Sequence, residues 1–250
     1  MVPLLETEKL TKQFGAFRAV DEVDFSLQTG ETRAIIGPNG AGKTTFFNLI
    51  SGVLKPTSGS VILEGNNIDG LSAFEIARKG ILRTFQISSI FPALNLLENV
   101  LLGAQSDFIK HFGLFMRQAT KKACKTKALE SIETVGLTMT DSTETSAGAL
   151  PHGYKKPLEI GMVLASTPKL LLLDEPTSGL SSEERKSVVE LLKRLSGKGL
   201  SIIIVEHDMD VVFSLAEKVT VLHFGRVIGE GTPAQIKRDK RVVEAYLGEG

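Results

Sequence analysis

The chain has 250 residues and equal numbers of basic and acidic side chains, 29 of each, so its formal net charge is zero. This balance argues against a broad nucleic-acid-binding face. A single cysteine, Cys124, excludes a disulfide within the chain and suits a reducing cytosol. We find no apolar run of membrane-spanning length and no basic-then-apolar secretion signal at the N-terminus. Cys124 lies among lysines and is predicted to be an incidental surface residue.

The N-terminal region has the alternation of a sheet. Residues 4–10 and 17–27 are predicted to form two strands around a turn at Gly15, and in the second strand apolar residues alternate with polar ones. Phe14 fits two roles, a core residue or a flat face for the ring of a ligand. The residues alone favour the first role.

A glycine-rich loop follows the buried strand predicted at residues 32–36. Its sequence fits the pattern G-x-x-x-x-G-K-[ST] and comprises Gly37, Pro38, Asn39, Gly40, Ala41, Gly42, Lys43, Thr44 and Thr45. Glycines let successive N–H groups turn inward around an anion, and the helix that follows adds its positive dipole end. Lys43 can reach the β- and γ-phosphates, and the Thr44 hydroxyl can ligate Mg²⁺. The loop therefore predicts a site for a nucleoside triphosphate.

The middle of the chain changes character. A strand is predicted at 60–63, a helix start at Ser72, and a strand at 81–85 that runs into Gln86. From residue 87 to about residue 164 helical patterns replace strands, with helices predicted at 95–102 and 117–135. We interpret this stretch as a helical insertion in an α/β core.

A second candidate site lies at residues 169–175, where a run of leucines ends in Asp174 and Glu175. The run predicts a strand buried on both faces. Ligands of open α/β sheets bind at the carboxyl ends of such strands. Asp174 can hold Mg²⁺ through its water shell, and Glu175 can polarise a water molecule against the γ-phosphate.

The C-terminal part continues the α/β pattern. Ser181 and Glu184 form a possible capping box for the next helix, and a buried strand is predicted at 201–205. His207 follows that strand, so we expect it beside the end of the Asp174 strand. Strands at 218–222 and 227–230 and short helices at 233–237 and 242–247 complete the prediction.

These signals stand in one order, and with them the chain resembles the ATP-binding subunit of ABC transporters along nearly its whole length. The resemblance implies that residues 37–45 are the Walker A motif and residues 170–175 the Walker B motif, with Glu175 as catalytic glutamate. It implies that Gln86 is the Q-loop glutamine, which senses Mg²⁺ and γ-phosphate, and that His207 is the switch histidine. Phe14 falls at the position of the aromatic residue that stacks on adenine, and the resemblance favours that role.

The resemblance also implies a fold, an α/β P-loop NTPase with a RecA-like core, an N-terminal antiparallel β subdomain and an inserted α-helical subdomain. One nucleotide-binding domain would cover residues 1–250. Its core and β subdomain would come from residues 1–86 and 165–230, its helical subdomain from 87–164 and a C-terminal helical tail from 231–250. The implied cofactors are ATP and Mg²⁺, with Lys43, Gln86, Glu175 and His207 as catalytic residues and Thr44, Gln86 and Asp174 at the metal.

Residues 83–86, 158–160 and 231–249 are similar to those of branched-chain amino acid importers. Urea or amide importers and lipopolysaccharide-export ATPases share parts of these segments. The implied partners are transmembrane permease subunits, a second ABC ATPase chain, identical or not, and indirectly a periplasmic or extracellular solute-binding protein, but no nucleic acid. The implied place is peripheral, at the cytoplasmic face of the inner or plasma membrane. The alternatives are a soluble ABC ATPase and a nucleotide-binding regulatory module without turnover.

The chain departs from the family pattern at residues 150–154, Leu-Pro-His-Gly-Tyr, here called the signature segment. The resemblance implies that this segment contacts ATP on the partner chain through Pro151 and Gly153. Pro151 stands where a serine is expected and has neither a hydroxyl nor an N–H. Tyr154 and the D-loop residue Ser181 also differ from the pattern. One hypothesis is a weakened signature in an asymmetric dimer; the other is that Gly153 and backbone shifts compensate.

Overall fold

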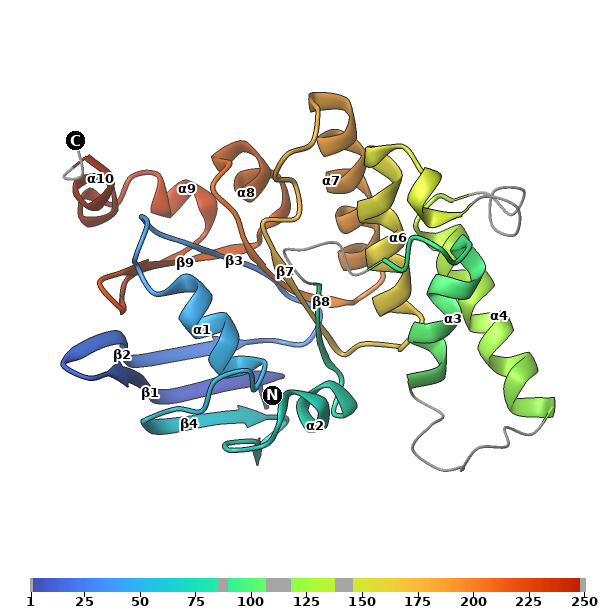
Figure 1. Cartoon of the computed structure of the whole chain (residues 1–250). Coiled ribbons are helices and arrows are strands. Elements are labelled where there is room, and N and C mark those ends of the chain that lie inside the picture. The colour runs from blue at the N-terminus through green and yellow to red at the C-terminus, as the bar shows by residue number, and fades with distance from the viewer. Residues whose placement is uncertain (1, 85–89, 107–117, 138–145, 248–250) are drawn as a thin grey trace. The chain divides into compact units, whose positions relative to one another are not determined.

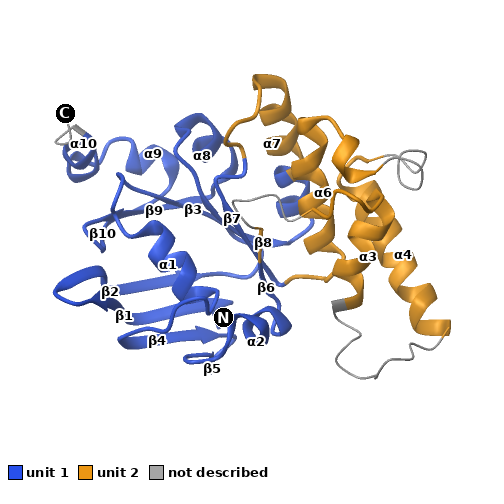
Figure 2. Ribbon diagram, viewed as in Figure 1, with its two compact units in different colours: residues 1–82, 169–176, 192–250 blue, residues 83–168, 177–191 orange. Residues whose placement is uncertain are grey.

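The computed structural model describes residues 2–84, 90–106, 118–137 and 146–247. The chain divides into two compact units, coloured separately in Figure 2. The first consists of residues 1–82, 169–176 and 192–250, and the second of residues 83–168 and 177–191. Gln86 lies outside the described residues, so its predicted role stays a prediction.

An antiparallel sheet occupies the N-terminal part of the first unit (Figure 1). Its strand order is β2-β1-β4-β5, formed by β1 (Leu5–Phe14), β2 (Phe17–Leu27), β4 (Ser58–Leu63) and β5 (Asn66–Asn67). The two predicted N-terminal strands are present, but β1 continues to Phe14, which pairs with Phe17 across the hairpin. The hairpin therefore places two aromatic rings at the same end of the sheet.

The second sheet has the order β10-β9-β3-β8-β7-β6. Its strands are β3 (Thr32–Ile36), β6 (Ile81–Arg83), β7 (Leu170–Asp174), β8 (Ser201–Val205), β9 (Lys218–His223) and β10 (Arg226–Gly231). Strands β7, β8, β3 and β9 pair in parallel, and β10 pairs antiparallel with β9. Every residue of β3, β7 and β8 is buried, and each strand contains a run of at least three apolar residues, as burial on both faces requires. The parallel pairing brings the ends of β3, β7 and β8 to one edge.

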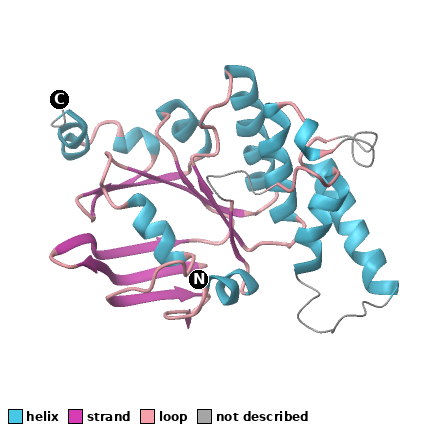
Figure 3. Ribbon diagram, viewed as in Figure 1, coloured by secondary structure: helices cyan, strands magenta, loops and turns pink. Residues whose placement is uncertain are grey.

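Helices of the first unit accompany these sheets, and Figure 3 colours helices and strands separately. They are α1 (Lys43–Ile50), α2 (Ala73–Arg78), α8 (Met209–Leu215), α9 (Pro233–Ile236) and α10 (Lys240–Leu247). Helix α1 packs on β2, where the ring of Phe46 lies edge-on to that of Phe25, with centroids 5.4 Å apart. The helix start predicted at Ser72 is confirmed, and Glu75 completes a capping box with it. Helix α8 was not predicted, although its N-cap, Asp208, carries a recognisable signal.

The described elements of the second unit are helical. They are α3 (Leu96–Ser106), α4 (Gln118–Thr134), the 3₁₀ turn η1 (Ala147–Ala149), α6 (His152–Leu164) and the first part of α7 (Ser182–Gly197). A Cβ atom on Gly103 of α3 would come 1.9 Å from the carbonyl oxygen of Met162, so α3 and α6 can pack this closely only through a glycine. The surface prediction for Cys124 is wrong. Its side chain is buried, because it faces Ala104 of α3.

The combination of a largely parallel sheet, an antiparallel β subdomain and added helices confirms the predicted fold class. Among the described residues, no helix is both long and apolar enough to span a membrane. The edge where β3, β7 and β8 end is where the predicted site residues gather.

Candidate active site

The glycine loop between β3 and α1 is enclosed by backbone on two sides. A Cβ atom on Gly37 would come 2.1 Å from the carbonyl oxygen of Leu222, and one on Gly42 would come 2.3 Å from that of Ala19. Gly42 also has φ +103°, in a region that glycine adopts at low energy. The N–H of Gly225, in the β9–β10 turn, donates to the Ala41 carbonyl over 3.0 Å. The loop is therefore held in one shape by its neighbours.

The start of α1 is arranged for an anion. Its N-cap is Gly42, which has no side chain to accept from the helix, and its first turn contains no acidic residue. The free N–H groups and the dipole of this turn are thus available to a phosphate. The Lys43 ammonium donates to the carbonyl oxygens of Gly37 and Pro38 and is largely buried, whereas Thr44 is exposed. The loop therefore gathers positive potential at one point.

A cavity of about 280 Å³ opens at this point, entirely within the first unit. The described lining residues are Phe17, Ala19, Asn39, Gly40, Ala41, Gly42, Lys43, Thr44, Thr45, Glu175, Val205 and His207. The lining brings the loop together with two predicted catalytic residues, Glu175 and His207. Residues almost two hundred positions apart in the sequence thus share one cavity because β3, β8 and β7 are neighbours in the sheet.

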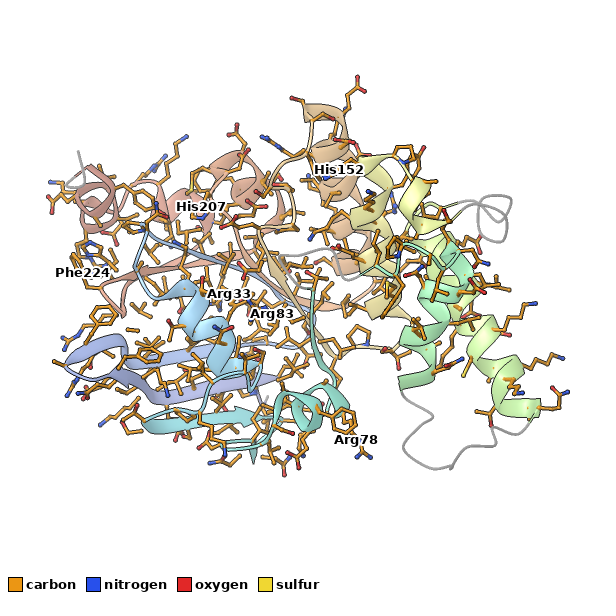
Figure 4. All side chains as sticks on the ribbon, viewed as in Figure 1. Arg33, Arg78, Arg83, His152, His207 and Phe224 are labelled. Carbon is orange, nitrogen blue, oxygen red and sulfur yellow. The ribbon has the colours of Figure 1, made fainter. Side chains whose placement is uncertain are left out.

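Glu175 and His207 contact each other directly. The Nε2 atom of His207 lies 2.8 Å from Oε1 of Glu175. The side chain of His207 is 50% exposed and that of Glu175 is 29% exposed. Figure 4 labels His207 beyond the end of β8. Glu175 has φ +46°, unusual for a residue with a side chain, and its N–H donates to Val205 O over 2.8 Å. We interpret this as a strained turn that directs the carboxylate into the cavity.

Asp174 is the last residue of β7 and is 1% exposed. It pairs with Val205, which itself lines the cavity. Its carboxylate and the Thr44 hydroxyl are hard oxygen donors of the kind that Mg²⁺ prefers. The part of the chain that the structure describes holds no cluster of three or more His, Cys, Asp or Glu side chains that could bind a metal alone.

The aromatic residue in the lining is Phe17, not the predicted Phe14. Phe14 is 48% exposed, with the Lys12 ammonium 5.3 Å from its ring centroid. Phe17 is 61% exposed and faces the cavity from the start of β2. The role assigned to Phe14 stays a prediction, but the cavity favours Phe17 as the ring that stacks on a base. The sequence feature that could have indicated Phe17 is its position directly after the Gly15 turn, opposite Phe14.

The two rings form a matched pair for substitution. We expect Phe17→Ala to weaken nucleotide binding by roughly 5- to 150-fold, because stacking of a base on an aromatic ring contributes about 1–3 kcal/mol. Phe14→Ala is expected to change affinity less than threefold. Titration of both variants with a fluorescent ATP analogue checks this. The opposite order of effects would assign the base to Phe14.

The signature segment lies in the second unit at the start of α6. Pro151 is the N-cap of α6 and provides no side-chain hydrogen bond to it. Tyr154 is 49% exposed, and its N–H donates to the Pro151 carbonyl over 3.0 Å. The predicted capping box of Ser181 and Glu184 at α7 is confirmed, since each residue's backbone N–H donates to the other's side chain.

Two family models match the chain. One, described as "ABC transporter", matches residues 20–178, and the other, described as "Branched-chain amino acid ATP-binding cassette transporter", matches residues 226–250. The first match includes both the glycine loop and the Asp174-Glu175 strand. The second covers β10 and the C-terminal helices.

Curated relatives match over the full length. The chain is 37% identical to BraF of Pseudomonas aeruginosa, named as a high-affinity branched-chain amino acid transport ATP-binding protein, over 99% of this chain and 98% of that protein. It is 36% identical to LivG of Escherichia coli, which has the same description, over 99% and 98%.

Solved structures also match. The ADP conformation of an ATP-binding cassette of an ABC transporter has a TM-score of 0.85 at 32% identity and covers 99% of this chain and 100% of that chain. A dimeric post-hydrolysis cassette bound to ADP and Pi has a TM-score of 0.74 at 27% identity, covering 92% and 98%.

Proposed function

This chain belongs to the ABC transporter family of ATPases, and from that premise we propose that it binds and hydrolyses ATP to power the uptake of branched-chain or other amino acids. The observation that carries the ATPase part is the single cavity shared by the glycine loop, Glu175 and His207. The similarity to BraF and LivG and the family match at residues 226–250 support the amino acid part.

In this proposal the cavity binds the triphosphate through the loop amides and Lys43, while Phe17 stacks on adenine. Glu175 accepts a hydrogen bond from the water that attacks the γ-phosphate, and His207 fixes the Glu175 carboxylate through the 2.8 Å contact. Geometry supports this division, since Lys43 lines the cavity from the start of α1 and Glu175 lines it from the turn that follows β7.

We assign Mg²⁺ to Thr44 and Asp174, with Gln86 as a further predicted ligand. The donors fit the ion, because both described groups provide oxygen: Thr44 lines the cavity from the first turn of α1, and Asp174 ends β7 next to the lining residue Glu175. When bound, the ion neutralises charge on the β- and γ-phosphates. The remaining coordination would come from phosphate oxygens and water, in keeping with the small number of protein donors.

The proposed partners are the permease subunits of a transporter and a second ATPase chain, at the cytoplasmic face of the membrane. A solute-binding protein would deliver the amino acid to the permease. Support comes from the dimeric cassette structure to which the chain is similar and from relatives named as transport proteins. In such a dimer, the signature segment of each chain would complete the ATP site of the other.

Co-purification tests the assembly. The tagged chain is expressed with its candidate permease subunits and recovered in detergent, and ATP hydrolysis is then measured in the complex and in the chain alone. We expect a stable complex with hydrolysis that depends on Glu175. Recovery of the chain without permease subunits, together with hydrolysis stimulated by nucleic acid, would support a soluble ABC ATPase instead.

A further inference from the structure

The first turn of α6 lacks two of the contacts that normally hold such a turn. Its N-cap is Pro151, whose side chain accepts nothing from the helix. Pro157 lies inside α6 and has no N–H to donate to the carbonyl of Gly153, four residues earlier. An N-cap serine would accept from the second or third amide of the helix, which here are those of Gly153 and Tyr154. Apart from the Tyr154 N–H, which donates to the Pro151 carbonyl, this turn therefore depends on contacts from outside α6.

The side chain of Glu184 lies beside Gly153, where an N-cap serine side chain would accept a hydrogen bond. A Cβ atom built on Gly153 would come 2.5 Å from Oε1 and 2.7 Å from Cγ of Glu184, so the Glu184 side chain packs directly against the glycine. The other oxygen, Oε2, accepts from the Ser181 N–H over 2.8 Å. Gly153 and Glu184 both belong to the second unit and line one cavity of about 280 Å³. One carboxylate thus contacts the starts of two helices, α6 and α7.

The charge of Glu184 suits this position. Hydrogen bonds from the Ser181 backbone and hydroxyl, then the nearby His152 and the Gly153 N–H, hold the pKa of the Glu184 carboxyl below its usual value. The group is therefore ionised at neutral pH, and an anion is favoured at a helix N-terminus. Figure 4 labels His152 at the beginning of α6.

We propose that Glu184 is a positioning residue of the signature segment, whose carboxylate caps α6 at Gly153 in place of the missing serine hydroxyl. The inference rests on the proposed function, in which this segment meets the γ-phosphate on a partner chain. Because the Gly153 N–H is engaged by Glu184 and the Tyr154 N–H by the Pro151 carbonyl, Glu184 acts on the segment by ordering the first turn of α6. Glu184 thus compensates for Pro151 within the same chain.

Substitution of Glu184 tests the proposal in the assembled transporter. We expect Glu184→Ala to lower ATP turnover roughly 3- to 30-fold, the effect of losing an N-cap at a site that must be ordered. Binding of ATP to the variant's own glycine loop should stay within about twofold, because that loop lies in the other unit. Glu184→Gln retains an acceptor oxygen and should keep most of the turnover. Glu183→Ala, one residue away and exposed, is the matched control.

The decisive arm is the double variant Pro151→Ser/Glu184→Ala. A serine at the N-cap can accept the Gly153 N–H, so turnover should rise clearly above that of Glu184→Ala and recover to within about twofold of wild type. A purely structural role of Glu184 in capping α7 would not be restored by a change at α6. Lack of recovery would overturn the proposal.

The rate of hydrogen exchange at the Gly153 amide tests the proposed cap independently of ATP hydrolysis. In the isolated chain with ¹⁵N-labelled glycine, Glu184→Ala should speed exchange at Gly153 at least about tenfold, and Glu183→Ala should not. Equal exchange in the two variants would contradict the proposal. If the wild-type complex hydrolyses no ATP while this exchange difference is present, the proposed function fails and the capping role stands.

Discussion

Glu175→Gln is expected to lower steady-state ATP turnover by on the order of 100-fold or more while ATP binding persists, because it removes the general base. The amide keeps the size of the side chain and an oxygen that can accept from His207, so the strained turn at φ +46° should survive. Turnover is measured by phosphate release and binding by titration with a fluorescent ATP analogue. In the complex, the variant should accumulate with ATP bound and the dimer closed.

The matched control for this prediction is Asp210→Asn, an exposed acidic residue in the first turn of α8, close in sequence to His207. It should leave turnover within twofold of wild type. Undiminished turnover in Glu175→Gln would mean that another group activates the water, and the catalytic assignment of Glu175 would then be wrong.

Lys43→Ala is expected to weaken ATP binding by roughly 10- to 150-fold, because a charge-assisted hydrogen bond to a phosphate contributes about 1.5–3 kcal/mol. The side chain is 7% exposed and bonds to the carbonyls of Gly37 and Pro38, so its removal also loosens the loop that presents the amides. Isothermal titration with a non-hydrolysable ATP analogue gives the affinity. The melting temperature of the free protein separates loss of binding from loss of fold.

An exposed lysine on the same unit provides the comparison. Lys79, at the end of α2, is exposed and does not line the cavity. We expect the Lys79→Ala variant to bind nucleotide with the affinity of the wild type. Tight binding by Lys43→Ala would show that the loop amides and the α1 dipole suffice for the triphosphate, and Lys43 would lose its assigned role.

The fold was predictable where local patterns carry the information. The strands β3, β7 and β8 each contain a run of at least three apolar residues, and the capping boxes at Ser72 and Ser181 are visible as sequence patterns. Helix α8 was not predicted because its 7 residues are too few for a helical period to stand out, although the Asp208 side chain caps it. The burial of Cys124 was not predicted because several of its neighbours in sequence are exposed lysines on α4. The contact that buries it comes from α3, which is distant in sequence.

The site was predictable in its residues but not in their contacts. The glycine loop and the Asp174-Glu175 strand were identified from residue types, and their shared cavity follows from the sheet order. The choice between Phe14 and Phe17 depends on which ring the β1–β2 hairpin turns toward the cavity, which no local pattern encodes. The Glu184–Gly153 contact joins residues on different helices and is likewise a product of tertiary packing.

The most direct test of the proposed function is uptake of labelled leucine by proteoliposomes that contain this chain, its permease subunits and the matching solute-binding protein. We predict uptake that requires ATP, is lost in Glu175→Gln, and is displaced by unlabelled isoleucine and valine but not by urea. Uptake that persists in Glu175→Gln would contradict the catalytic assignment. Glu175-dependent ATP hydrolysis without any uptake of amino acids would contradict the proposed transport function.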